Sequence, residues 1–397
     1  MNNTTGKIKL SRRLVSLGLT GLILFTACGK NDGKDGAGIT VHNASGAICL
    51  ESGGKEYVYM TEKTGEGYFD PSIICRVDTR TFTKEVLCAK PDCLHDDKTC
   101  PRYTDENMGV RLMPSIDGER VYAAISKFDG SFDIIAVNAD GLSKEKIFSL
   151  EGEDDLFISD KVALEGDYLY FFVNTLTPYD GGESCTLYKL NTKTSEGEKL
   201  VNLEGAGVIV GVQEEKIIAI NITGLPGDRQ SSVITINDNG RVKTLFNVPG
   251  DISATLIYAE DMFYFVSGTP LAVEGLAPGE KEWETLFVSP DINAGTAYFD
   301  GYFDGKLHIS YRTDNGVSRR VFMPDSTGVM YIPDIVPTEE NEVTYRTILA
   351  RTKEYFYIAT FTVNDTLDRT RLITDVRDVF VKKDDYYHGL TEYIEIG

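Results

Sequence analysis

The sequence predicts an all-β fold, a seven-bladed β-propeller, and three observations carry this prediction. A short strand pattern recurs seven times, at intervals of 44 to 63 residues. Each copy is followed about twenty residues later by a strand, a turn and another strand. Amphipathic helical periodicity over three or more turns is absent from the sequence, so helices are not expected in the core. A period of roughly 40 to 50 residues, worth about four strands, is typical of propeller blades.

The repeated pattern is a turn rich in Gly, Asp or Glu followed by alternating aromatic and aliphatic residues, as in "GKEYVYM" and "EGDYLYF". Its equivalent position is occupied by Tyr59, Tyr122, Tyr170, Ile218, Tyr264, His308 and Tyr357. Two stacked β-sandwiches are the competing interpretation, but a sandwich does not predict seven evenly spaced copies of one strand. Six or eight blades are the alternatives within the propeller class.

The two ends of the body, residues 39–397, offer strands that could close the ring. "GITVH" (Gly38–His42) and "EYIEI" (Glu392–Ile396) both alternate and lie outside the seven copies. One or the other could complete the last blade.

The first 27 residues have the pattern of an export signal. Four basic residues precede the apolar run "LVSLGLTGLILF", which is too short to anchor stably across a bilayer. Thr26 and Ala27 before Cys28 resemble the lipobox of bacterial lipoproteins, although Phe25 stands where these proteins prefer Leu. The resemblance implies a lipoprotein signal peptide over 1–27, with lipid attachment at Cys28. An ordinary secretory signal with a chance cysteine is the alternative.

Residues 28–38 continue with "GKNDGKDGAG", which is polar, glycine-rich and typical of a flexible tether. Without residues 1–27 the chain has 36 basic and 61 acidic residues, a net charge of −25. So acidic a surface repels phosphate backbones, which argues against nucleic acid as a partner. We therefore expect an extracytoplasmic protein that contacts the cell membrane through the lipid on Cys28.

One segment is not explained by the repeat. The first interval is longer than the others by about fifteen residues, and the excess is an inter-blade insertion at about 88–107. It contains Cys88, Cys93, His95 and Cys100, the spacing C-x4-C-x-H-x4-C. Three thiolates and an imidazole are the ligand types of a closed structural zinc site, although the spacing is not a common one. Disulfides are an equally favoured alternative, because six cysteines beside Cys28 are an even number and an exported chain can oxidise them; bonds from Cys88 or Cys100 to Cys49 or Cys75 are included. Free thiols are the third alternative.

The remaining cysteines and histidines are expected to be structural. Cys75, Cys49 and Cys185 fall in strand-like apolar context, where a small buried thiol packs like other apolar residues. His308 occupies the repeat position that is Tyr or Ile in other blades, so we expect it to be packed. His42 and His388 lie near the closing ends and have no evident partners in the sequence.

The sequence favours binding over catalysis. It contains no G-x-S-x-G, H-E-x-x-H, Walker or G-x-G-x-x-G motif, so no catalytic residue is assigned. Two stretches, 174–184 and 267–284, are longer than a hairpin needs and resemble a binding rim, although tolerated surface insertions explain them equally well. The expected function is a binding or scaffolding module at the cell envelope with a protein, peptide or glycan ligand. The alternative is a carbohydrate-active or other hydrolytic propeller with acidic residues at the central channel.

The lipobox, the repeated "G-[DE]-x-[LVF]-Y" strand and the "LC-x4-C-x-H-x4-C" insertion together resemble a group of uncharacterised secreted β-propeller lipoproteins of anaerobic Gram-positive bacteria. The likeness covers most of the chain after the tether, and the Cys/His insertion is its specific part. It implies an extracytoplasmic location and a propeller, and no particular reaction. A fold-level similarity to TolB-like propellers implies binding rather than catalysis.

Overall fold

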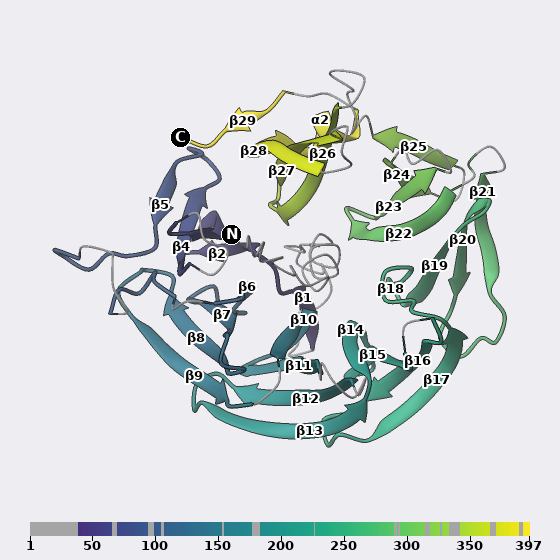
Figure 1. Cartoon of the computed structure of the whole chain (residues 1–397), viewed down its shortest axis with the longest axis horizontal. Helices are drawn as coiled ribbons and strands as arrows, with labels where there is room; N and C mark the ends of the chain where they lie inside the picture. The colour runs from purple at the N-terminus through teal and green to yellow at the C-terminus, as the bar shows by residue number, and fades with distance from the viewer. Residues whose placement is uncertain are drawn as a thin grey trace, which may run out of the picture.

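Seven antiparallel sheets follow one another along the chain and are arranged in a ring in the computed structural model (Figure 1). The structure describes residues 39–397 except 66–69, 94–98, 105–106, 153–154, 177–182, 226, 290–291, 293, 314–317, 326–327, 333–341, 366–370 and 389–391. The predicted signal peptide, Cys28 and the tether therefore lie outside the described residues. None of the helices in the described ranges is long and apolar enough to cross a membrane.

Each sheet is a blade built mainly from consecutive strands. Blade 1 contains β2 (Ala47–Ser52), β3 (Lys55–Lys63), β4 (Ser72–Asp78) and β5 (Lys84–Val86). Blade 2 contains β6 (Gly109–Pro114), β7 (Arg120–Ser126), β8 (Phe132–Asn138) and β9 (Lys144–Leu150). Blade 3 contains β10 (Asp155–Glu165), β11 (Tyr168–Leu176), β12 (Glu183–Asn191) and β13 (Glu196–Glu204), together with β1 (Thr40–Asn43). Blade 4 contains β14 (Ala206–Gln213), β15 (Lys216–Thr223), β16 (Gln230–Ile236) and β17 (Val242–Pro249).

The second half of the ring repeats the arrangement. Blade 5 contains β18 (Leu256–Ala259), β19 (Met262–Gly268), β20 (Leu271–Leu276) and β21 (Glu284–Ser289). Blade 6 contains β22 (Ala294–Phe303), β23 (Lys306–Thr313), β24 (Ser318–Asp325) and β25 (Gly328–Ile332). Blade 7 contains β26 (Glu342–Arg351), β27 (Tyr355–Asp365), β28 (Arg371–Lys382) and β29 (Ile394–Glu395), with the short helix α2 (Lys383–Tyr387) between its last two strands.

The prediction of an all-β propeller is confirmed. All seven repeat positions, from Tyr59 to Tyr357, lie in the second strand of a blade. The expectation of about four strands per blade holds for six sheets, whereas the sheet of blade 3 has five strands because β1 is added to it.

The acidic turns of the repeat are tight turns between the first and second strands of a blade. Glu214 and Glu215 have φ of 48° and 60°, and Glu260 and Asp261 have φ of 47° and 57°. Two successive residues with positive φ are what a two-residue turn needs to follow the twist of the flanking strands. The turn therefore fixes the hairpin without glycine in these blades.

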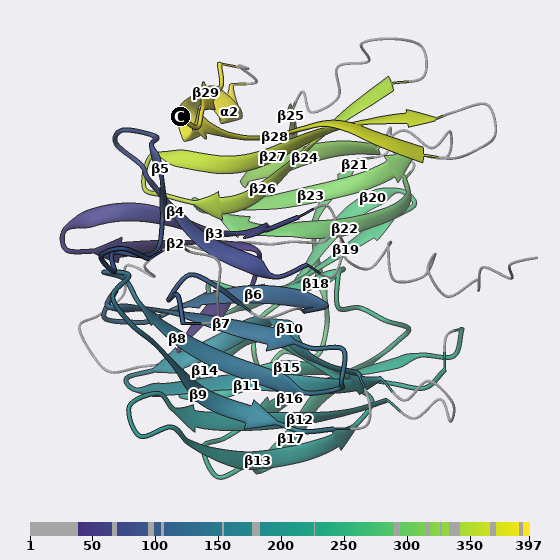
Figure 2. The ribbon, with the colours of Figure 1, turned by 60° about the vertical axis from the view of Figure 1, so that its left-hand side comes forward.

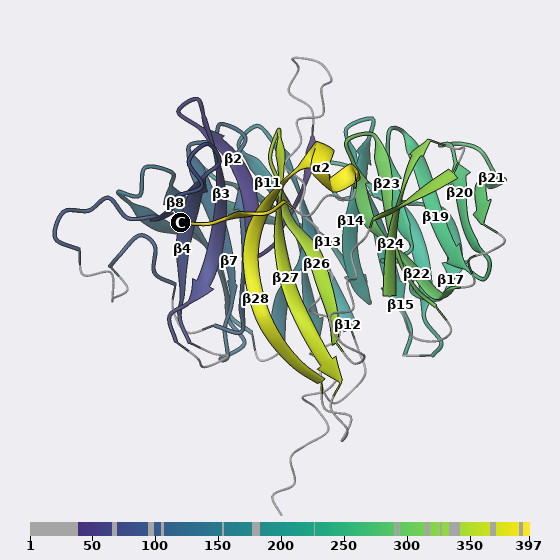
Figure 3. The ribbon, with the colours of Figure 1, turned by 90° about the horizontal axis from the view of Figure 1, so that it is seen from above.

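Successive strands alternate in direction, so the turns define two faces of the ring. We call the side that carries the turns between first and second strands the hairpin face. The opposite side, which carries the second-to-third connections and the links between blades, is the connection face. In the side view of Figure 3, α2 lies near the upper edge of the ring and the β27–β28 hairpin extends downward to the other side.

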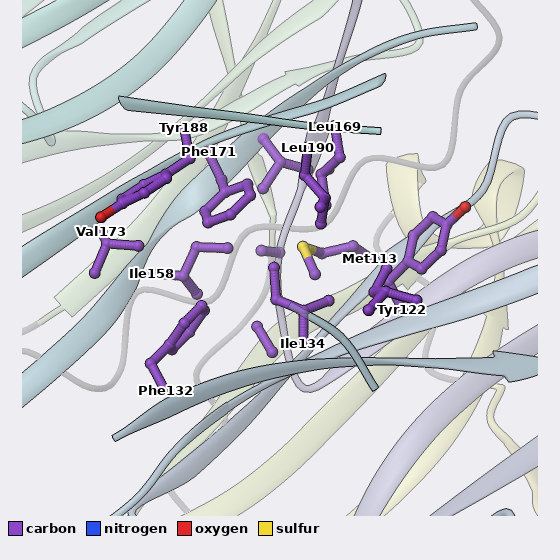
Figure 4. Packing of buried hydrophobic residues seen from close by; sticks show 14 of the residues in the cluster. Met113, Tyr122, Phe132, Ile134, Ile158, Leu169, Phe171, Val173, Tyr188 and Leu190 are labelled. Carbon is purple, nitrogen blue, oxygen red and sulfur yellow. The ribbon is translucent and has the colours of Figure 1, made fainter. Parts of the chain in front are cut away.

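The core consists of layers between neighbouring sheets, which pack face to face (Figure 2). One layer joins blades 2 and 3, where Phe132 and Ile134 of β8 meet Phe171 of β11 (Figure 4). The Phe171 ring stacks on Tyr188, with 5.7 Å between ring centroids. Burial of side chains this large contributes about 2 kcal/mol each, so the blade interfaces hold the ring together.

The structure decides which of the two end strands completes the last blade. "EYIEI" supplies β29, which pairs with β28 and completes blade 7 as predicted. "GITVH" does not, because β1 pairs with β10, the innermost strand of blade 3. A short alternating strand can pair with any open strand edge. The sequence does not indicate that the edge of β10 at the centre of the ring is open.

Blades 1 and 7 are joined without exchanging a strand. The Gly397 carbonyl accepts a hydrogen bond from the Lys84 amide (3.0 Å), and the Gly397 amide donates to the Phe82 carbonyl (3.1 Å). The Phe82 ring packs against Tyr355 and Phe380 of blade 7, with centroid distances of 5.2 and 5.3 Å. Phe82 thus fills the junction from the turn between β4 and β5.

We expect Phe82→Ala to lower the free energy of unfolding by about 2 kcal/mol, because it removes apolar contact between blades 1 and 7. Phe128 is the matched control, since its side chain is 47% exposed in the loop between β7 and β8 of blade 2. Phe128→Ala should change stability by no more than about 0.5 kcal/mol. Urea unfolding of both variants measures the difference, and equal effects would contradict the role of Phe82.

Candidate functional site

The Cys/His insertion connects β5 of blade 1 with β6 of blade 2, as the sequence predicts. Leu87 is buried in the core between these blades and fixes the start of the insertion. The next residues are held by the backbone, because the Cys88 amide donates to Val86 (2.8 Å) and the Ala89 amide donates to Gly141 (3.0 Å). The insertion therefore begins in contact with both blades.

Gly141 is required where it lies. It is in the turn between β8 and β9 with φ of 72°, and a Cβ there would be 3.0 Å from the Cys88 nitrogen. Only glycine combines this backbone conformation with so close an approach. The β8–β9 turn of blade 2 therefore packs directly against the backbone at Cys88.

The returning part of the insertion pairs with β4 beyond the end of β5. Tyr103 forms a β-bridge with Ile73, and the Ile74 amide donates to the Arg102 carbonyl (2.8 Å). Thr104 and Ser72 exchange hydrogen bonds through backbone and hydroxyl groups, at 2.8 to 3.1 Å. These bonds place the preceding residue Cys100 in a fully buried position.

Buried Asn107 fixes the end of this segment. Its amide nitrogen donates to the hydroxyls of Ser72 (3.4 Å) and Thr104 (3.3 Å). The Lys63 ammonium donates to the Asn107 side-chain oxygen at 2.9 Å. The insertion is thus tied at both ends to the side of blade 1.

The geometry brings Cys88, Cys93 and Cys100 together, with their sulfur atoms within 4.8 Å of one another. Cys100 is buried and the other two are half-buried. Burial and, to a smaller extent, the neighbouring thiols raise the pKa of the Cys100 thiol to about 12, although a hydrogen bond from the Arg102 backbone opposes them. The structure contains the six cysteines of the described residues as thiols. His95, the predicted fourth ligand, lies outside the described residues.

The other cysteines lie in strands, as expected. Cys49, Cys75 and Cys185 are buried in β2, β4 and β12. The Cys75 sulfur lies 3.8 Å from a Glu62 carboxylate oxygen, and burial raises its pKa to about 11. Thiols with these properties are unreactive core residues.

His308 is packed, as expected from its repeat position. It is buried in β23, and its Nε2 lies 3.2 Å from the Tyr387 hydroxyl of α2. The same Tyr387 hydroxyl donates to Asp304 (2.9 Å), which also accepts from Lys383 of α2 (2.7 Å). The helix, which the sequence did not predict, thus joins the hairpin face of blade 6 to blade 7.

At the centre of the ring, a bulge in β10 presents polar groups. The β10–β11 register shifts between Ile158 and Val162, and Asp160 within this bulge pairs with Arg111 of β6. Burial lowers the pKa of Lys161 to about 8, although the Asp160 charge opposes this. Burial also lowers the pKa of His42 on β1 to about 4, so its imidazole is neutral at neutral pH.

A hydrolytic site would need carboxylates that converge near the axis. Asp160 is already neutralised by Arg111, and Asp300 of β22 accepts a hydrogen bond from Ser310. Within the described ranges, the three thiols are the only group of three or more His, Cys, Asp or Glu side chains close enough to share an ion. Glycoside hydrolysis needs only a pair of carboxylates, so the hydrolytic alternative stays a prediction.

The two predicted rim loops differ in the structure. The stretch 174–184 connects β11 and β12 on the connection face, and its residues 177–182 lie outside the described residues. The stretch 267–284 is not one loop, because β20 (Leu271–Leu276) occupies its middle. Its two connections, Thr269–Pro270 and Ala277–Trp283, lie on opposite faces of the ring.

The ring of sheets defines the chain as a β-propeller. No protein-family model matches the chain, and no curated protein matches it in sequence. Its structure is similar to the β-propeller domain of the Trilobed protease from Pyrococcus furiosus, which has an open velcro topology (12% identity, 89% of this chain and 96% of that chain covered, TM-score 0.48).

Two further solved structures show the range of the likeness. One is TolB from Acinetobacter baumannii (12% identity, 80% of this chain and 79% of that chain, TM-score 0.35). The other is a prolyl endopeptidase (14% identity, 85% of this chain and 48% of that chain, TM-score 0.48), of which the chain spans about half the length. At these identities the comparisons concern the fold alone.

Proposed function

We propose that this protein is a lipid-anchored, extracytoplasmic propeller that binds a protein, peptide or glycan ligand at the cell envelope. The observation that carries the proposal is the position of β1. This strand follows the predicted tether directly and lies at the innermost edge of blade 3, at the centre of the ring. A lipid on Cys28 would therefore hold the propeller near its axis.

The direction of β1 also supports an orientation. Thr40 lies opposite Leu164, beside the turn between β10 and β11, whereas Asn43 lies opposite Lys161. The chain therefore reaches β1 from the hairpin face. The eleven residues 28–38 span at most about 36 Å when fully extended, so the hairpin face is the one held toward the membrane.

The orientation presents the second-to-third connections and the links between blades to the exterior. The turns between first and second strands, on the hairpin face, are only two to five residues long. The connection face carries the eight-residue connection between β3 and β4 and the six-residue connection between β15 and β16. Variable connections on a rigid ring are where binding residues concentrate, so the ligand is expected on this face.

Charge argues for a gap between the ring and the lipid. Turns of the hairpin face carry Glu214–Glu215, Glu260–Asp261 and Asp304. Carboxylates are repelled by anionic headgroups. We expect the tether to be extended rather than the hairpin face to lie on the bilayer.

The test combines Cys28→Ser with two epitope insertions in protoplasts of a Gram-positive host. Gly130 (connection face) and Gly279 (hairpin face) are matched insertion sites, because both are glycines with positive φ in turns. We expect antibody to bind the Gly130 epitope more strongly than the Gly279 epitope on intact protoplasts, and both equally after detergent. Cys28→Ser should release most of the protein from the membrane fraction and abolish labelling by radioactive fatty acid.

The outcomes separate the parts of the proposal. Membrane retention and fatty-acid labelling of Cys28→Ser would refute the lipid anchor. Equal binding to both epitopes on intact protoplasts, with the anchor in place, would refute the orientation and the outward connection face.

A further inference from the structure

The three thiols of the insertion are brought together by independent backbone contacts. Cys88 is placed by Val86 and by the Gly141 turn of blade 2, through hydrogen bonds of 2.8 and 3.0 Å at Cys88 and Ala89. Cys100 is placed from the other side, because the Tyr103 amide donates to its carbonyl (3.1 Å) and Tyr103 bridges to β4. The two ends of the insertion therefore place the sulfur atoms of Cys88 and Cys100 close together.

The number of converging sulfurs distinguishes a metal from a disulfide. A disulfide joins two sulfurs at about 2 Å and leaves a third thiol unused beside it. A tetrahedral zinc site places each sulfur about 2.3 Å from the ion, which puts the sulfurs about 3.8 Å from one another. Three sulfurs within 4.8 Å of one another are close to the second arrangement.

The ligand type selects the ion. Thiolates are soft ligands that favour zinc or iron–sulfur centres over the hard cations calcium and magnesium. Zinc needs no redox partner, and it binds by displacing one proton from each thiol. The buried position of Cys100 suits a closed structural site rather than one open to substrate.

We propose that Cys88, Cys93 and Cys100 supply three of the four ligands of a structural zinc ion, which fastens the insertion between blades 1 and 2. The role of the zinc ion follows from the length of β5. This strand has only three residues, so the outer edge of blade 1 has only a short ladder of backbone hydrogen bonds. The ion ties the start of the insertion, beside the Gly141 turn, to its returning part on β4. The proposal is independent of lipid attachment, because Cys28→Ser removes the anchor and leaves these thiols in place.

The test measures zinc per chain in the full-length protein, purified in detergent without added metal, by native mass spectrometry and elemental analysis. We expect about one zinc per chain in the wild type, and less than about a tenth of that in Cys88→Ser, Cys93→Ser and Cys100→Ser. The matched control is Cys185→Ala, which removes a buried cysteine of blade 3 and should keep its zinc. His95→Ala tests the predicted fourth ligand separately. Loss of zinc from this variant would identify His95 as a ligand beside the three cysteines.

Limited proteolysis keeps the test valid if a variant folds poorly. Chelator treatment of the wild type should expose the insertion to cleavage between residues 88 and 108 while the blades stay intact. A zinc-free wild type whose denatured mass is lower by the two hydrogens of a disulfide would overturn the proposal. Zinc retained by all three serine variants would overturn it as well.

Discussion

Replacing Gly118 by alanine is expected to lower the free energy of unfolding by about 3 kcal/mol or more. Gly118 lies in the turn between β6 and β7 with φ of 71°, a conformation that costs other residues energy. A Cβ at this position would lie 1.9 Å from the carbonyl oxygen of Glu51 and 3.1 Å from its carbonyl carbon. Because the obstructing atoms are backbone of blade 1, the two blades would have to move apart.

Gly166 provides the control for this prediction. It occupies the corresponding turn of blade 3 with φ of 54°, and a Cβ there would have no atom within 4 Å. Gly166→Ala therefore carries the backbone cost alone, about 1 kcal/mol. Urea denaturation of the two variants measures the difference, and similar losses for both would show that the contact of Gly118 with blade 1 is not tight.

The second large effect is expected at Asp133, a buried carboxylate on β8 of blade 2. It forms ion pairs with the Lys127 ammonium (2.5 Å) and the Lys146 ammonium (3.2 Å), and it accepts a hydrogen bond from the Ser149 hydroxyl (2.6 Å). Asp133→Ala leaves Lys127 largely desolvated without its counter-ion, since the Lys127 side chain is only 19% exposed. We expect a loss of about 3 kcal/mol in the free energy of unfolding.

The same carboxylate gives the protein an acid-dependent stability. Burial alone would raise the pKa of Asp133, but hydrogen bonds from Lys127 and Ser149 outweigh burial and hold this pKa below its usual value. A carboxyl group with a depressed pKa stabilises the folded state above its unfolded pKa of about 3.9, and loses that contribution as the pH falls through the folded pKa.

Asp133→Asn should therefore flatten the acid limb of the stability–pH curve. Glu145→Ala is the control, because the pair of Glu145 with Arg120 is exposed and such pairs contribute less than about 1 kcal/mol. An unchanged acid limb in Asp133→Asn would contradict the assignment.

Local pattern predicted the blades, because turn and strand alternation are written in neighbouring residues. Tyr59, Tyr170 and Tyr357 could be aligned for this reason, and each lies in a second strand. The strand β20 was not recognised, because Pro270 stands directly before it and Gly275 interrupts its apolar alternation. The five-residue helix α2 was too short to show helical periodicity.

Features that depend on distant contacts could not be predicted. The spacing of Cys88, Cys93 and Cys100 pointed to a common site, but the convergence of their sulfurs depends on the pairing of Tyr103 with Ile73. The place of β1 depends on which strand edge stays open at the centre of the ring. Neither the bulge at Asp160 nor its ion pair with Arg111 leaves a trace in the local sequence.

The pairing of β1 with β10 sets an order of events in folding. Blades 1 and 2 each consist of consecutive strands, so they can form as soon as they are synthesised. Strand β1 precedes them in the chain, but its partner follows them, with Thr40 opposite Leu164. Strand β1 therefore stays unpaired until two blades and the first strand of a third have formed.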